Sequence, residues 1–365
     1  MGKEVLMNPA DLIPTPDAIP VHWIWFQLLL FLTLFIHIVL MNIMLGTVVI
    51  AFCRHFHNPE SSCLLTREIS KKLPFTIALA VNFGVAPLLF VQVLYGHFIY
   101  VSSILMATLW IAIIDILILA YYTAYIYRYK YQTLEYGRPV ATGLISSLLL
   151  LIAFLFSNNF TLMLHPATWP QYFTHPAAML LNTTDPTLVP RYLHFVCSSL
   201  AIGGLAIAVF FNQKKYRQQA ESRQWVRYGC NWFAYATFVN FAIGFWFFGS
   251  LPAGLIKPTT LVGAIFSIAL VLGVITALLG VIHAVRLKIL SAVSLIAASI
   301  FSMMLARELL RVAYLSPYFS LADLKIVPAY SPFALFLLFF IGGIGLIGWM
   351  LKTAWQSLNR KEVEP

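Results

Sequence analysis

The stretch LLLFLTLFIHIVLMNIMLGTVVIAF, residues 28–52, decides what kind of protein this is. It is apolar over more residues than the roughly 20 that a helix needs to cross the hydrocarbon of a bilayer. Its only ionisable side chain is His37, near the middle. In hydrocarbon even a neutral imidazole needs a partner for each ring nitrogen, so we expect His37 to face protein, a cofactor, an ion or a proton path.

The composition of the whole chain is that of a membrane protein. Of its 365 residues, 61% are hydrophobic and only 10% are charged, and the mean hydropathy is +0.85. This excludes a water-soluble globule and predicts an all-α, polytopic helical bundle. The first residues, MGKEVLMNPADLIPTPDAIPVH, lack the basic segment and short apolar core of a signal peptide. We therefore expect the first helix to be retained.

Apolar runs between charged or Pro/Gly-rich breaks predict about nine transmembrane helices. Their expected ranges are 23–53, 75–95, 98–127, 141–164, 192–212, 229–250, 259–285, 288–306 and 332–354. One membrane domain, residues 23–355, is expected between an outer segment, 1–22, and a cytoplasmic tail, 356–365. No repeat of 20–50 residues, of the kind that builds solenoids, is evident.

The formal net charge of +10 indicates orientation in the membrane. Lys and Arg gather after alternate spans, within 54–72, 128–138, 214–227, 286–288 and 352–361. Because cytoplasmic loops carry an excess of basic residues, the N-terminus is expected outside and the C-terminus in the cytoplasm. The charge then requires no nucleic acid as a partner. The four cysteines form no CxxC pair, which argues against a thiolate metal site.

Few ionisable side chains fall inside the predicted spans. The main ones are His37, Asp115, His194, Arg307 and Glu308. Histidines at similar depth on different helices are what a bundle uses to hold a heme, because neutral imidazole is a good axial ligand to iron. An arginine nearby suits a carboxylate such as a heme propionate. Met303 and Met304 are expected in the apolar core, although methionine sulfur is also an axial ligand.

Each of these residues also has a simpler interpretation. A single buried histidine is more often a hydrogen-bonded packing residue than a ligand, and His194, at the start of its span, fits an interfacial side chain. Asp115 fits a protonated structural carboxyl or an interhelical pair as well as a functional group. Arg307 and Glu308 fit an ion pair or a solvated helix end. His55, just beyond the first span, is expected in a loop.

Five stretches of the chain together resemble subunit I of the cytochrome bd quinol oxidases. FQLLLFLTLFIHIVLMNIMLG, 26–46, carries a histidine and a glycine nine residues apart, as in the first helix of that family. VNFGVAPLLFVQVLYG, 81–96, resembles the family's FGVA segment. SNNFTLMLHPATW, 157–169, and RYLHF, 191–195, are similar to the end of its fourth helix and the start of its fifth. ARELL, 306–310, resembles a degraded form of its GREPW motif.

The resemblance implies roles for individual residues. His37 corresponds to the axial ligand of the high-spin heme, and His194 to one ligand of the low-spin heme b. Arg307 and Glu308 correspond to the Arg-Glu pair of GREPW. Asp115 lies in the helix in which the family carries acidic residues beside its hemes and proton path. The candidate catalytic residues are therefore Glu308 and Asp115, and the candidate cofactor-binding residues are His37, His194, Arg307, Met304 and Met303.

The chain also departs from the family pattern. The outer half of the seventh span, PTTLVGAIFSIALVLG, 258–273, has neither Met nor His to serve as the second ligand of the low-spin heme. Met304 stands where the family has a glutamate, one turn before the Arg-Glu pair. The loop GSLPAGLIKP, 249–258, is too short to form a quinol-binding loop of the family's kind. A c-type cytochrome docked outside is therefore a candidate electron partner.

The expected function is a heme-b-binding subunit of a respiratory oxidoreductase complex in the bacterial cytoplasmic membrane, transferring electrons near the outer face. A second bd-like membrane subunit and a c-type cytochrome are the expected partners, with quinone as a further candidate and a d-type heme as a second candidate cofactor. Whether oxygen is reduced stays open. The alternatives are a heme-free structural subunit and a proton-coupled transporter using Asp115, which would be expected to have broken helices and an internal repeat.

Overall fold

The computed structural model describes residues 8–58, 63–173, 177–213, 216 and 221–360. Within this part of the chain, nine helices are long and apolar enough to cross a membrane, and there is no β-strand. They are α1 (Trp23–His57), α2 (Leu64–Leu105), α3 (Ala107–Tyr129), α4 (Gly137–Leu164), α5 (Leu188–Phe211), α7 (Ser222–Gly249), α8 (Leu261–Val285), α9 (Ile289–Leu315) and α10 (Tyr330–Arg360). The prediction of an all-α, multi-pass membrane bundle is confirmed.

Several helices are longer than their apolar runs. α1 continues to His57, so the prediction that His55 lies in a loop is wrong: His55 is fully buried, and its Nε2 lies 2.9 Å from the hydroxyl of Tyr127 on α3. α9 continues to Leu315, so Arg307 and Glu308 lie inside a helix and not at a solvated end. Hydropathy missed these extensions because polar and charged residues end the apolar run while the helix continues, with His55 of α1 and Arg311 of α9 buried against neighbouring helices.

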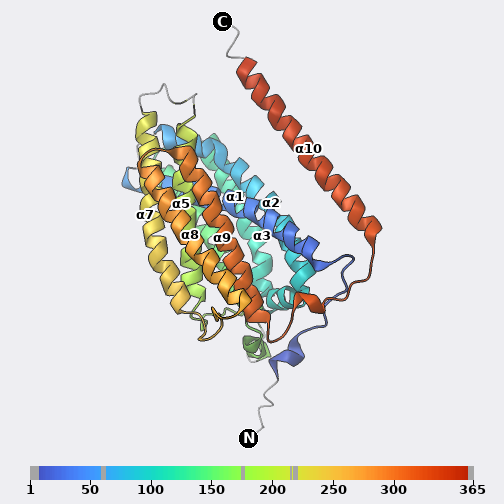
Figure 1. Cartoon of the computed structure of the whole chain (residues 1–365). Helices are drawn as coiled ribbons and strands as arrows, with labels where there is room; N and C mark the ends of the chain where they lie inside the picture. The colour runs from blue at the N-terminus through green and yellow to red at the C-terminus, as the bar shows by residue number, and fades with distance from the viewer. Residues whose placement is uncertain (1–7, 59–62, 174–176, 214–215, 217–220, 361–365) are drawn as a thin grey trace.

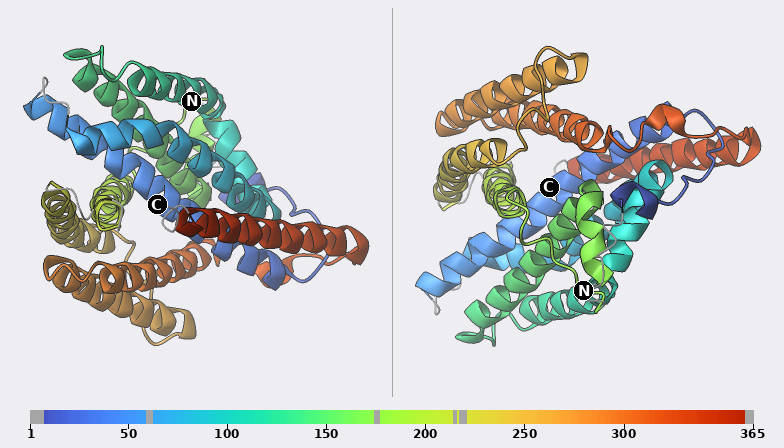
Figure 2. Two further views of the ribbon diagram at one scale, coloured as in Figure 1. Left: turned by 90° about the horizontal axis from the view of Figure 1, so that it is seen from above. Right: turned by 90° about the horizontal axis from the view of Figure 1, so that it is seen from below.

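The bundle is built from two groups of four helices. α1 packs mainly on α2 and α3 mainly on α4; in the second group α5 packs mainly on α7 and α8 mainly on α9. Figure 2, which looks along the bundle, shows the two groups on opposite sides, with α1 and α5 between them. Since α1 and α5 begin at the same end, the two groups run in the same direction. Where they meet, Asn42 bonds to Ser199 and Gly46 lies against Gly203, and the members of each pair are 157 positions apart. This correspondence is called the repeat.

The two groups meet where α1 crosses α5. Gly46 of α1 lies against the backbone of Ser199 and Gly203 on α5, and a Cβ added to Gly203 would lie 2.6 Å from the Cα of Gly46. Only glycine permits so close an approach, and small residues are the usual means by which membrane helices meet. One turn away, the buried hydroxyl of Ser199 donates to Oδ1 of Asn42 at 2.6 Å.

α10 stands outside the bundle. Figure 1 shows it leaving the end at which α9 finishes and leaning away from the other helices. Its first turns touch the bundle through aromatic contacts, with Phe333 5.8 Å from Trp25 and 6.1 Å from Phe26 between ring centroids. Further along, nothing lies within 4 Å of a Cβ built on Gly345 or Gly348.

The N-terminal segment closes one end of the bundle. Ile19 is buried and forms a bridge to Ile326, through hydrogen bonds from its amide to Lys325 and to its carbonyl from Val327, each 2.9 Å long. This end, where α1 begins and α9 ends, is called the outer end below, following the sequence prediction. The orientation itself stays a prediction. Residues 1–7 and 361–365 of the predicted terminal segments, and the basic residues Lys214, Lys215 and Arg217, lie outside the described residues.

Replacing Gly203 by valine tests the crossing of α1 and α5. The added side chain has no room against Gly46, and overpacking of this kind costs about 1–3 kcal/mol. We expect a lower Tm for the detergent-solubilised protein, measured by circular dichroism. Gly345→Val on α10 is the matched control and should leave the Tm unchanged, because its site is open. Equal Tm values for the two variants would contradict a tight crossing.

Candidate functional site

The side chain of His37 packs against α2. Its Nδ1 lies 2.9 Å from the carbonyl oxygen of Ala80, so Nδ1 carries the proton and donates. The ring lies against the next turn of α2: a Cβ added to Gly84 would lie 2.7 Å from Cε1 of His37. The bond to Ala80 fixes the tautomer and leaves Nε2 as the nitrogen with a lone pair.

His194 occupies the corresponding place on α5. Its ring lies beside the backbone of Asn240 on α7, and a Cβ added to Gly244 would lie 3.4 Å from Cε1 of the ring. The backbone of Asn240 interacts with the ring, but Nδ1 is buried and makes no hydrogen bond of ordinary geometry within the described part of the chain. A buried ring nitrogen without a full hydrogen bond is costly, so His194 is a candidate ligand.

The two histidines occupy equivalent positions of the repeat. Gly46 and Gly203 each lie nine residues after the histidine of their own helix, and the bonded pair Asn42 and Ser199 each lie five residues after it. The opposing contacts also match: Ala80 and Gly84 on α2, and Asn240 and Gly244 on α7, are both four residues apart. The chain therefore places His37 and His194 at the same depth, about 13 Å from the glycine crossing toward the outer end.

From the sequence alone, this spacing was used only for His37. The pattern of a histidine followed by a glycine nine residues later occurs at His37 and again at His194. The signal that would have shown the repeat was therefore present. It was missed because a single shared spacing in two apolar helices is weak without knowing that the two glycines touch.

A cluster of buried charges lies between α5 and α9 toward the outer end. The guanidinium of Arg311 donates to Glu308 at 2.9 Å, and the hydroxyl of Tyr95 donates to the same carboxylate oxygen at 3.3 Å. Arg307 lies over the ring of Phe160 on α4, 5.1 Å from its centroid. Arg191 of α5 lies over the ring of Phe247 on α7, also at 5.1 Å. These hydrogen bonds and cation–π contacts accommodate the charged side chains inside the bundle.

The cluster has more positive charge than its carboxylates balance. Arg191, Arg307 and Arg311 are close enough to interact electrostatically, against two carboxylates: Glu308, paired with Arg311, and Asp185, near Arg191. Among the described residues, Nε and Nη2 of Arg191 and Nη2 of Arg311 are buried without hydrogen-bond partners. Buried guanidinium groups with unused donors are suited to an anion, above all to carboxylates or phosphate. Arg191 was missed from the sequence because it stands at a helix start, where an interfacial side chain is the usual case.

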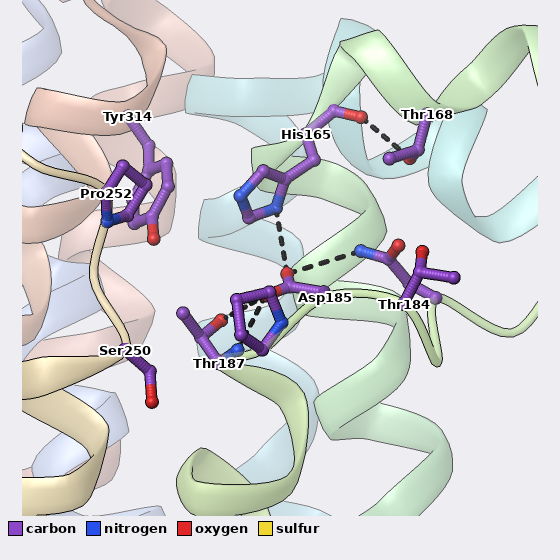
Figure 3. A pocket seen from close by; sticks show the side chains of 10 residues that line it. His165, Thr168, Thr184, Asp185, Thr187, Ser250, Pro252 and Tyr314 are labelled. Atoms are coloured by element: carbon purple, nitrogen blue, oxygen red, sulfur yellow. Dashed lines mark hydrogen bonds and ion pairs between the residues drawn. The ribbon is translucent and has the colours of Figure 1, made fainter.

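A small pocket opens at the outer end beside this cluster (Figure 3). His165, at the end of α4, lies 3.2 Å from the carboxylate of Asp185 and opposite the ring of Tyr314, 4.8 Å between ring centroids. Asp185 also accepts from the amide and hydroxyl of Thr187 at 2.7 and 2.8 Å. The pocket holds about 150 Å³. Because sites for drug-sized ligands span roughly 300–1,000 Å³, it suits water or a small ion and not a porphyrin.

Three other candidate residues lie apart from these groups. Asp115 is exposed on α3, and no hydrogen bond or ion pair joins it to another described residue. Met303 packs against Gly273 of α8, and Met304 is buried in the bundle. The described residues also form no group of three or more His, Cys, Asp or Glu side chains able to hold a metal ion. The structure thus brings together Arg307 and Glu308, and matches His37 with His194, but leaves Asp115 separate.

The pair formed by Glu308 and Arg311 can be tested by stability. Neutralising Glu308 alone, with Glu308→Gln, leaves Arg311 buried without its counter-charge, and breaking a buried pair costs about 3–5 kcal/mol. Adding Arg311→Met removes the stranded charge and should restore much of the lost Tm. Thermal unfolding of the single and double variants in detergent measures this. A double variant less stable than Glu308→Gln would show that Arg311 is held by something other than Glu308.

Comparison of the chain with protein-family models and with curated protein sequences finds no match to either. The interpretation of this site therefore rests on the chemistry and geometry of the chain's own residues.

Proposed function

We propose that this chain is a heme-b-binding membrane subunit of a respiratory oxidoreductase complex, in which electrons pass near the outer end of the bundle. The observation that carries the proposal is the matched pair His37 and His194. Each lies on the central helix of its group, beside a glycine of the facing helix and at the same depth. Such placement is expected of two ligands kept by both halves of a repeat, and less expected of two unrelated packing histidines.

The donor set suits a heme. A heme supplies an iron that cycles between two oxidation states by one electron. His37 would offer Nε2 to the iron, because its Nδ1 proton is committed to Ala80. A hydrogen bond of this kind makes an imidazole ligand more basic and fixes the plane of its ring. His194 would offer a ring nitrogen from a buried position, which keeps water away from the ligand bond.

The buried arginines complete the fit. A heme carries two carboxylates, and the three arginines Arg191, Arg307 and Arg311 present more positive charge than Glu308 and Asp185 together neutralise. Arg307 would hold a propionate, as the resemblance also implies, and Arg191 is the added candidate. Tyr95 and Glu308 keep Arg311 in place through their hydrogen bonds. By the resemblance Glu308 is also a candidate catalytic residue, and that role stays a prediction.

We place the protein in the bacterial cytoplasmic membrane as part of this proposal. The nine long apolar helices among the described residues make the chain a multi-pass membrane protein, so a lipid bilayer is its environment. A second membrane subunit and a c-type cytochrome at the outer end are the partners proposed here. Quinone is a weaker candidate, because the segment 249–258, between α7 and α8, is too short for a quinol-binding loop.

The two alternatives differ in their support. A heme-free structural subunit is favoured by the absence of Met and His from 258–273 and by Met303, which packs against Gly273 and so serves as core. A transporter is favoured by the parallel repeat and by the non-helical backbone at Tyr95 inside α2. The exposed position of Asp115 argues against the transporter, because a coupling carboxylate is expected to face the interior or a water-filled path.

Heme content of the purified protein decides between these functions. We expect a pyridine hemochrome spectrum of heme b from the protein isolated in detergent. His37→Ala and His194→Ala should each lower the heme per chain, and the double variant should lower it further. His57→Ala, at an exposed position of α1, is the matched control and should leave heme content unchanged.

Two results would contradict the proposal. No heme in the wild-type complex would exclude it outright. Heme content unchanged in folded His37→Ala and His194→Ala would assign the heme to another subunit and favour the heme-free alternative. The Tm of each variant, measured alongside, separates loss of heme from loss of fold.

A further inference from the structure

Asp115 lies within a membrane-spanning helix, on a surface that faces lipid, where a carboxylate without a partner is costly. It is eight residues past Ala107, the first residue of α3, and so about 12 Å along the helix from its outer end. Its neighbours on the helix surface, Ile111 and Ile118, are 63% and 61% exposed, which is the exposure of side chains that face lipid. No other described residue bonds to Asp115. A charge at this depth is costly, and such residues nearly always face protein or water.

Asp115 is also part of a regular seam along the outside of α3. The residues at alternating intervals of three and four are Thr108, Ile111, Asp115, Ile118, Tyr122, Tyr125 and Tyr129. All are exposed except Tyr125, which is half-buried and stacks on Tyr129 with a centroid separation of 5.9 Å. This interval is the heptad spacing with which two helices pack along each other, and a single polar residue in such a seam fixes the register of the pair.

We propose that this seam binds a transmembrane helix of a partner protein that presents a lysine, arginine or histidine opposite Asp115. A basic side chain at that depth would neutralise the carboxylate and remove it from lipid. The apolar and tyrosine positions on either side would pack against the partner helix. The proposal does not depend on heme binding, since it uses only the outer surface of α3.

A second copy of this chain is a poorer occupant. Two copies inserted in the same orientation would meet through α3 about an axis along the membrane normal, as closed dimers do. That arrangement places Asp115 opposite Asp115, and like charges in low dielectric repel each other. α3 offers no Lys or Arg at this depth to another copy, because its one basic residue, Arg128, lies at the far end of the helix.

Site-specific photocrosslinking in native membranes tests the seam. A photoreactive phenylalanine analogue is placed at Ile118, and at Ile268 on α8 as a control with a similar exposed fraction of 60%. We expect Ile118 to crosslink to one membrane protein, with the crosslink mapped by mass spectrometry to a helix that has a basic residue within a turn of it. Asp115→Leu should lower the yield at least several-fold.

The charge-swapped pair makes the test decisive. Asp115→Lys should abolish the crosslink, and replacing the partner's mapped basic residue by aspartate should restore it. Three results would overturn the proposal: crosslinks at Ile118 to lipid alone, crosslinks to a second copy of this chain, or an unchanged yield in a correctly inserted Asp115→Leu variant. Each of these leaves the heme measurement above unaffected.

Discussion

The contact on which the rest of the bundle depends is the crossing of α1 and α5 at Gly46 and Gly203. Lipid tails are as apolar as the side chains of these helices, so burial of apolar surface does little to hold the helices together. Close backbone packing and the hydrogen bond from Ser199 to Asn42 supply what burial does not. Because the two glycines and the two bonded residues are equivalent in the repeat, the same contact sets the relation between the two groups of helices.

The crossing also sets the depth of the two histidines. A helix rises about 1.5 Å per residue, so equal spacing from a shared contact places His37 and His194 level with each other. Each ring then lies beside a glycine of the next helix. At Gly84 a Cβ would lie only 2.7 Å from the ring of His37 and would displace it, whereas at Gly244 a Cβ would reach ordinary contact distance, 3.4 Å, from the ring of His194. Glycines therefore have two roles in each half: Gly46 and Gly203 let the helices approach closely, and Gly84 and Gly244 lie beside the imidazoles.

The charged residues of the chain fall into two kinds of surroundings. Arg191, Arg307 and Arg311 are inside the bundle, where carboxylates, aromatic rings and hydrogen bonds offset part of their cost. Asp115 is on the outside and has none of these partners among the described residues. The first arrangement points inward to a ligand with negative charge. The second points outward to another protein. The proposed cofactor site and the proposed partner site therefore lie on different faces of the molecule.

The sequence by itself determined the fold class, because about 20 consecutive apolar residues in each of nine runs can be stable only as membrane helices. It also singled out His37 and His194, since ionisable groups are rare in such runs. It did not determine the helix ends beyond Arg54 or Leu305, where buried polar residues extend α1 and α9. Which side of a helix a residue faces is settled by packing between segments far apart in the chain. Only the tertiary structure therefore decided that Gly46 meets Gly203, that Arg191 joins Arg307, and that Asp115 faces outward.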